Sequence, residues 1–195
     1  MITKSRHVDV YGVGGSGMTA VSLQRRLYRI SVNAHAWTES HLGLASAALM
    51  DQDCVAIALS NSGQTRDTLD MVSMARTRGA FTVAMTSDPL SPVAAAANVH
   101  IQTCPSGDYL NPGELAAQSA QLFVINLLYL LVARCDHERA DGALALTAAA
   151  VEGRQAGAPA VVGTRAPLPA PRQSLPFRDS HRVDDTPGMG VSFIV

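Results

Sequence analysis

Strand-like and helix-like segments alternate along residues 7–153 of this chain, and this alternation narrows the possible folds more than any other feature. Short apolar runs typical of buried strands are each followed by apolar residues at helical spacing. The pattern predicts an α/β domain, a three-layer sandwich in which a five-stranded parallel sheet of order 2-1-3-4-5 lies between two layers of helices. The expected strands are 7–13, 31–36, 54–59, 81–85 and 99–103, and the expected helices are 16–29, 38–50, 65–78, 89–97, 113–134 and 136–153.

Two loops rich in glycine and serine follow the first and third expected strands. The first loop is 12–17, Gly-Val-Gly-Gly-Ser-Gly, and the second loop is 60–65, Ser-Asn-Ser-Gly-Gln-Thr. Each leads into a helix, whose first N–H groups lack partners and carry a positive partial charge, so each loop can hold an anion. In a sheet of this order the first and third strands flank the point where strand order reverses, which is where ligands bind. The two loops therefore predict one anionic ligand held from two sides.

A dinucleotide is the alternative ligand for the first loop. Gly12, Gly14 and Gly17 satisfy the pattern G-x-G-x-x-G, and Glu39 follows at about the distance of a ribose contact. Glu39, however, is expected at the start of a helix rather than at a strand tip. A dinucleotide site also needs no second phosphate loop, so the paired loops favour a different anion.

Composition excludes several classes of protein. The chain has 195 residues, 47% of them hydrophobic, and a formal net charge of -1, which suits one domain with its own core. A surface for nucleic acid normally has a basic face, which this charge argues against. The three cysteines lack metal-ligand spacing, and Cys54 and Cys104 are expected to be small buried side chains in a reducing cytoplasm. The sequence predicts no metal site and no cofactor.

No targeting or membrane-spanning segment is expected. Residues 1–9 carry charges such as Lys4 and Asp9 and lack the apolar core of a signal peptide. The longest apolar stretch, 122–133, contains Asn126 and is too short to cross a bilayer, so it is expected to be a buried helix. These features predict a cytoplasmic protein without a membrane partner.

The character of the sequence changes after Gly153. Residues 1–153 are expected to form the domain, and 154–195 a proline-rich, largely disordered tail, because that segment has no helical or strand periodicity. Its last residues, 191–195, are Val-Ser-Phe-Ile-Val and could instead dock as an edge strand.

The second loop is the most specific motif of the chain. Residues 60–65 strongly resemble the S-x-S-G-x-T phosphate loop of SIS (sugar isomerase) domains, which have a flavodoxin-like fold. The resemblance covers about 8–150 and leaves out the tail. It implies that a phosphosugar binds at the carboxyl edge of the sheet. Further stretches similar to the family are 10–16, 53–59, 79–86, 91–94 and 97–98.

The resemblance also implies roles for individual residues. Hydroxyl groups of the second loop would hold the phosphate with help from the loop backbone, and the first loop would touch the sugar or its phosphate. The alternative is that the serines only cap a helix. The implied ligand-binding residues are Ser60, Ser62 and Thr65 with their hydroxyls, Asn61, Gly63 and Gln64 with their backbone, and Gly15 and Ser16 in the first loop.

Whether such a domain catalyses a reaction depends on a base near the sugar carbons. Residues 113–119 are similar to a stretch of sugar-isomerase enzymes in which Glu114 takes the place of the catalytic glutamate. The chain would then be a sugar-phosphate aldose–ketose isomerase with Glu114 as general base. Glutamate in a first helical turn is also favoured by the helix dipole, whatever its function.

Other stretches are more similar to a sensor than to an enzyme. Glu39 and His41 resemble a pair in the sensor domains of RpiR-type bacterial sugar regulators, although an exposed capping pair is the alternative. Residues 119–129 resemble a helix of the same sensors, with Ala120 and Asn126 in place of the arginine and aspartate of that family. We therefore expect the phosphosugar-sensing part of such a regulator, or a free-standing relative, without chemistry of its own.

RpiR-type regulators carry a helix-turn-helix domain before the sensor. The first expected strand begins near His7, which leaves no room for that domain, so this chain as given is expected not to bind nucleic acid directly. Apolar surface left uncovered favours a homodimer, and the apolar helix 122–132 is the expected interface.

Overall fold

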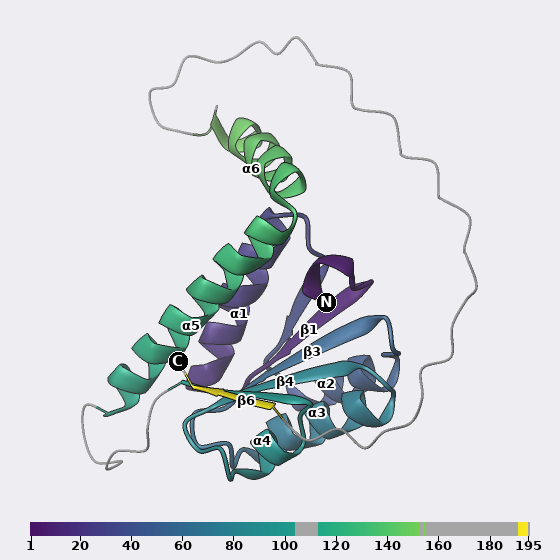
Figure 1. Ribbon diagram of the computed structural model, residues 1–195, viewed down its shortest axis with the longest axis vertical. Helices are drawn as coiled ribbons and strands as arrows, with labels where there is room; N and C mark the ends of the chain where they lie inside the picture. The colour runs from purple at the N-terminus through teal and green to yellow at the C-terminus, as the bar shows by residue number, and fades with distance from the viewer. Residues whose placement is uncertain (104–112, 153, 155–190, 195) are drawn as a thin grey trace.

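A six-stranded parallel sheet of order β2-β1-β3-β4-β5-β6 forms the centre of the molecule (Figure 1). The structure is a computed structural model that describes residues 1–103, 113–152, 154 and 191–194, with side chains at all of these except 113–115 and 191–194. The strands are β1 (His7–Tyr11), β2 (Ala34–Trp37), β3 (Cys54–Leu59), β4 (Phe81–Thr86), β5 (Val99–Gln102) and β6 (Val191–Ile194).

The predicted order 2-1-3-4-5 is confirmed, and the sheet has one strand more than predicted. β6 pairs in parallel with β5, with Val99 opposite Val191 and Gln102 opposite Ile194. Residues 191–194 therefore form an edge strand, which was the alternative to a disordered tail for 191–195.

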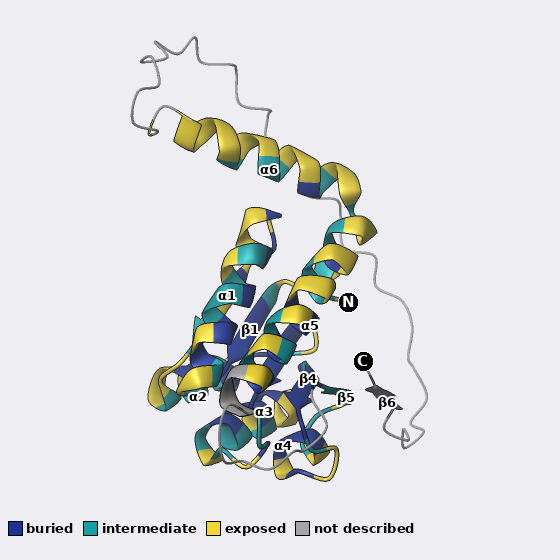
Figure 2. Cartoon of the chain, turned by 90° about the vertical axis from the view of Figure 1, so that its left-hand side faces the viewer, coloured by how far each residue is buried: buried dark blue, intermediate teal, exposed yellow. Residues whose placement is uncertain are grey.

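Helices cover both faces of the sheet (Figure 1). On one face lie α1 (Gly15–Arg29) and α5 (Gly113–Cys135), and on the other lie α2 (Ser40–Ala48), α3 (Arg66–Thr77) and α4 (Pro92–Ala95). α6 (His137–Glu152) lies at the end of the α1–α5 pair rather than on the sheet (Figure 2). A short 3-10 turn, η1 (Ile2–Lys4), precedes β1.

β3 shows why a continuous apolar run is needed in the middle of such a sheet. All six of its residues are buried, because β1 and β4 flank it and helices cover both of its faces. Ile57 and Leu59 enter the core beneath α1 and α5, whereas Ala56 and Ala58 enter the core beneath α2 and α3. Cys54 is buried as predicted, Cys135 is exposed, and Cys104 lies outside the described residues.

Capping decides where two of the helices begin. Glu39, not the predicted Thr38, is the N-cap of α2, because its carboxylate oxygens accept the N–H groups of His41 and Leu42, each at 2.9 Å. Ser91 caps α4, which starts at Pro92 and is shorter than the predicted 89–97.

The expectation of a buried helix at 122–133 is only half right. One face of α5 packs against α1 and the sheet, but the opposite face is exposed and apolar (Figure 2). This outer stripe of α5 consists of Phe123, Leu127, Leu130 and Leu131. The longer stretch Ala116–Cys135 is long and apolar enough to cross a membrane, with a mean hydropathy of 1.6, a property that core helices of soluble proteins share.

One carboxylate is buried within the sheet. Asp9 on β1 is fully buried and accepts hydrogen bonds from Ser46 Oγ at 2.7 Å and Tyr11 Oη at 3.0 Å, and its Oδ1 lies 2.5 Å from His7 Nε2. Burial alone would raise the pKa of Asp9, but the hydrogen bonds from His7 and Ser46 outweigh it and lower that pKa. Three donors from β1 and α2 thus converge on one charged group.

Candidate functional site

The second loop joins β3 to α3 and keeps its hydroxyl groups away from the start of the helix. Thr65 is the N-cap of α3, yet its side chain makes no capping hydrogen bond. Its Oγ1 lies 3.1 Å from Ser60 Oγ instead, at the buried end of β3. Ser62 Oγ accepts the N–H of Gln64 at 3.3 Å. The serines therefore do not cap α3, which removes the alternative role that the sequence left for them.

Gly63 shapes this loop. Its φ of +64° lies in the left-handed region, and its N–H donates to the carbonyl of Ser60 at 3.1 Å, which makes a tight turn. A side chain is also excluded by space, since a Cβ at Gly63 would overlap the side chain of Ser91.

The first loop joins β1 to α1 in a similar way. Gly14 is the N-cap of α1 with a φ of +61°, and it has no side chain with which to cap the helix. Gly15 and Ser16 are the first two residues of α1, so their backbone N–H groups belong to the uncapped first turn.

The two uncapped helix ends follow neighbouring strands. Tyr11, the last residue of β1, is paired with Ala58 of β3, so the two loops leave neighbouring strands that are about 4.8 Å apart. α1 and α3 then diverge to opposite faces of the sheet (Figure 1). Among α1 to α4, only the two helices that follow the glycine- and serine-rich loops lack a side-chain cap, whereas α2 and α4 have one. The structure thus places two helix N-termini without side-chain caps after neighbouring strands, at the point where strand order reverses.

Glu39 and His41 lie on the other side of the first loop. They follow β2, which β1 separates from β3 and the second loop. The N–H groups of Leu42 and His41 hold the pKa of the Glu39 carboxyl below its usual range, and both of its oxygens are engaged in the cap. Each oxygen of this exposed carboxylate therefore already accepts one N–H and keeps room for one further hydrogen bond. Ligand contact by Glu39 and His41 stays a prediction.

Glu114 lies in the first turn of α5, and its side chain is outside the described residues. Its predicted role as a base thus stays a prediction. In the part of the chain that the structure describes, no group of three His, Cys, Asp or Glu side chains is placed to hold a metal ion.

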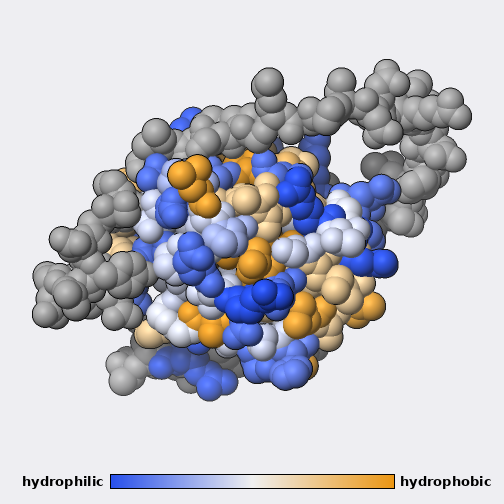
Figure 3. Space-filling model, turned by 90° about the horizontal axis from the view of Figure 1, so that it is seen from below, coloured by the Kyte–Doolittle hydropathy of each residue, from blue (hydrophilic) through white to orange (hydrophobic). Residues whose placement is uncertain are grey.

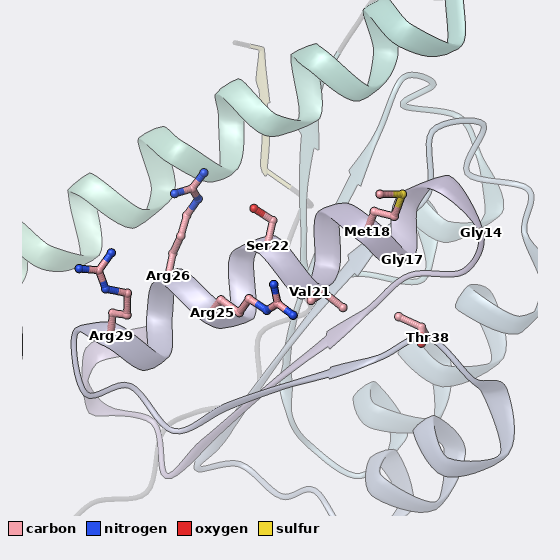
Figure 4. A pocket seen from close by; sticks show the side chains of 9 residues that line it. All are labelled: Gly14, Gly17, Met18, Val21, Ser22, Arg25, Arg26, Arg29 and Thr38. Atoms are coloured by element: carbon pink, nitrogen blue, oxygen red, sulfur yellow. The ribbon is translucent and has the colours of Figure 1, made fainter. Parts of the chain in front are cut away.

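A hollow of about 680 Å³ runs along the outer side of α1 (Figure 4). It reaches the first loop at Gly14 and Gly17 but contains no residue of the second loop. Three arginines of α1 line it, and none of them forms an ion pair with a described carboxylate. The remaining lining residues are Met18, Val21, Ser22 and Thr38, and the arginines are Arg25, Arg26 and Arg29.

Sequence reasoning missed a group of hydroxyl side chains beneath the second loop. Thr86 is the last residue of β4, the strand next to β3, Ser87 and Ser91 follow it, and all three are buried. Ser87 donates from both its N–H and its Oγ to the carbonyl of Asn61, each at 2.8 Å. The signal was present in the sequence, because these hydroxyls come at the carboxyl end of an expected parallel strand.

The fold and this edge define the class of protein: a doubly wound α/β domain with two open helix N-termini at its switch point. The family model of the SIS domain matches residues 1–131, and the chain belongs to the SIS domain family.

Curated and solved relatives agree with this assignment. The chain is 31% identical over 153 residues to the uncharacterized HTH-type transcriptional regulator YbbH of Bacillus subtilis. The matched stretch covers 78% of this chain and 54% of that protein. The sugar isomerase domain of an RpiR transcription factor from Sphaerobacter thermophilus is 29% identical with a TM-score of 0.64, covering 75% of this chain and 80% of that one. The NanR protein of Vibrio vulnificus complexed with ManNAc-6P shares the fold, at 23% identity and a TM-score of 0.74, over 80% of this chain and 59% of that one. The chain spans about half the length of the curated relatives that it matches.

Proposed function

We propose that this chain binds a phosphosugar between its first and second loops and is the ligand-sensing part of an RpiR-type transcriptional regulator or a free-standing relative. The observation that carries the proposal is the pair of neighbouring helix N-termini without side-chain caps, α1 and α3, beside capped α2 and α4. The second loop adds the hydroxyls of Ser60, Ser62 and Thr65, none of which caps α3, and hydroxyls are suitable donors for a phosphate. The complex of the similar NanR protein with ManNAc-6P supports this class of ligand.

The role proposed for Ser62 is tested by removing its hydroxyl. Ser62→Ala should raise the Kd for ManNAc-6P by about tenfold or more, because a hydrogen bond to a charged phosphate is lost. Isothermal titration calorimetry measures this, with Ser73→Ala on α3 as a matched control outside the loop.

Three outcomes would contradict the proposal. Equal affinity of Ser62→Ala and the parent, or no binding of any phosphosugar in a panel of aldose, ketose and aminosugar phosphates, would remove the second loop as the site. Deuterium uptake at C2 of the ligand in deuterated water that disappears in Glu114→Gln would contradict a role without chemistry and favour the isomerase.

We further propose that two copies pair through the outer stripe of α5. Phe123, Leu127, Leu130 and Leu131 recur at helical spacing and form an apolar face that nothing in the described part of the chain covers (Figure 2). The face of the molecule that Figure 3 shows, seen from below the view of Figure 1, differs from this apolar face of α5, because its apolar residues are scattered among hydrophilic ones.

The double variant Phe123→Glu/Leu130→Glu should be monomeric at concentrations where the parent is dimeric, because two carboxylates would have to be buried in the interface. Sedimentation velocity measures the change. The matched control is Leu42→Glu/Leu90→Glu, which alters two exposed leucines away from α5. A monomeric parent, or a double variant that remains dimeric, would exclude this interface.

A further inference from the structure

His100 on β5 is a buried histidine that belongs to neither loop. It is 7% exposed, and its Nε2 lies 2.9 Å from Thr86 Oγ1 at the end of β4. Its Nδ1 is buried and has no hydrogen-bond partner among the described residues. Burial lowers the pKa of His100, which keeps the ring neutral at pH 7. A polar ring held in the interior by a single hydrogen bond is costly, so that one bond calls for an explanation.

The hydroxyl groups around the ring fix the direction of this hydrogen bond. Thr86 Oγ1 donates to the carbonyl of Asp88 at 2.7 Å, and Ser91 Oγ donates to the same carbonyl at 2.7 Å. A hydroxyl has only one proton, so Thr86 Oγ1 accepts from His100, whose Nε2 therefore carries the hydrogen. His100 is thus the donor that completes a chain of hydrogen bonds from β5 to the turn after β4.

That turn supports the second loop. Gly63 is so close to Ser91 that a Cβ there would overlap its side chain and lie 3.3 Å from Thr86 Cγ2. The N–H of Val93 also donates to the carbonyl of Gly63 at 3.2 Å. The backbone at Gly63 therefore packs against the side chains of Thr86 and Ser91. Hydrogen bonds with His100 and with the carbonyl of Asp88 fix the hydroxyls of these two side chains.

A second connection runs from the same strand to the same loop. Gln102 Nε2 donates to the carbonyl of Ser87 at 2.9 Å, and Ser87 in turn donates to the carbonyl of Asn61. β5 thus reaches the second loop at Asn61 and at Gly63, although no residue of β5 belongs to the loop.

We infer that His100 is a positioning residue: by donating to Thr86 it fixes the Thr86–Ser91 pair and, through that pair, holds the second loop in the conformation that binds an anion. The ligand measurement below rests on the proposed function, whereas the rigidity of the loop can be measured without any ligand.

Three variants separate positioning from packing. His100→Leu removes the donor, Thr86→Val removes the acceptor, and His100→Gln keeps an amide N–H that can reach Thr86. We expect the Kd for ManNAc-6P to rise about tenfold in the first two variants, a change of about 1.4 kcal/mol, and to stay within about threefold of the parent in His100→Gln. The double variant His100→Leu/Thr86→Val should bind no more weakly than either single variant, because both remove the same bond.

Hydrogen exchange gives the readout without ligand. The Gly63 amide, which donates to Ser60, should exchange faster in His100→Leu than in the parent. Ala80 lies beyond the C-terminal end of α3, and its N–H donates to the carbonyl of Ala75. This amide should exchange at the same rate in His100→Leu and in the parent.

These measurements also overturn the inference cleanly. If His100→Leu lowers the Tm but leaves both the Kd and the exchange of Gly63 at parental values, His100 is a packing residue only. If the parent binds no phosphosugar, the proposed function fails and the exchange of Gly63 decides the inference alone. If His100→Leu does not fold, Thr86→Val and His100→Gln make the same comparison, and equal affinities or equal Gly63 exchange in these two overturn it.

Discussion

Replacing Gly63 with alanine should lower the free energy of unfolding by about 3 kcal/mol and abolish the proposed phosphosugar binding. An L-residue at a φ of +64° costs about 1–2 kcal/mol, and overlap of the new Cβ with Ser91 adds a penalty of similar size. Relief of the overlap would displace the loop, and with it the hydroxyls proposed to bind phosphate. Urea unfolding and calorimetric titration measure the two effects.

Gly142 provides the matched control for Gly63. It lies inside α6, and an added Cβ there would meet nothing within 4 Å. Gly142→Ala should therefore stabilise the protein by about 0.5–1 kcal/mol, because alanine is the better helix former. A Gly63→Ala variant with the urea midpoint and the affinity of the parent would show that the second loop tolerates a different backbone.

Replacing Asp9 with asparagine should lower the free energy of unfolding at pH 7 by about 3 kcal/mol. The carboxylate accepts from Ser46 and Tyr11, and because it can only accept, the His7 nitrogen beside it must donate. An asparagine offers one acceptor oxygen and adds two N–H donors, so buried donors would face one another. Urea unfolding measures the loss, with the exposed Asp53→Asn as control, for which a change within about 0.5 kcal/mol is expected.

The same pair of variants gives a pH dependence with a definite sign. The pKa of Asp9 is lower in the folded state than in the unfolded chain, where it is about 3.9. The charged carboxylate therefore contributes its full stabilisation above the pKa of the unfolded chain, and this stabilisation is lost as the pH falls through the pKa of the folded state. The difference in stability between the parent and Asp9→Asn should thus be constant near neutral pH and narrow below about pH 4. A difference that stays constant down to pH 2 would show that the charge of Asp9 contributes nothing.

Much of the fold could be predicted because its signals are local. The short apolar run of β3 is typical of a strand covered on both faces, and helical spacing after a glycine-serine loop favours a helix. The outer stripe of α5 could not be predicted in the same way, since an apolar residue such as Phe123 reads the same whether it faces a core or an open surface. Only the position of α1 decides which face of α5 is covered.

The candidate site also has one part that local sequence signals predict and another that only the packing of the fold determines. The sequence motif alone was enough to predict Ser60, Ser62 and Thr65 as ligand-binding residues, because a motif is contiguous in the sequence. The support beneath it, in which His100 donates to Thr86 while Thr86 and Ser91 donate to the carbonyl of Asp88, could not be derived from the sequence, since it depends on which side chains of neighbouring strands point to the same face. The capping by Glu39 rather than Thr38 was a choice between adjacent residues, which geometry alone decides.

The sixth strand bears on how this protein can be shortened. In the sheet, β6 pairs with the N–H and C=O groups along one side of β5, from Val99 to Gln102. A chain cut at the end of α6 would leave those groups as a bare edge, to which another extended segment could add, and such edges seed aggregation. His100 and Gln102 lie on that same strand, so a foreign strand that paired with β5 would pair directly with the strand that supports the second loop. Residues 191–194 would thus protect the free side of the strand that supports the second loop.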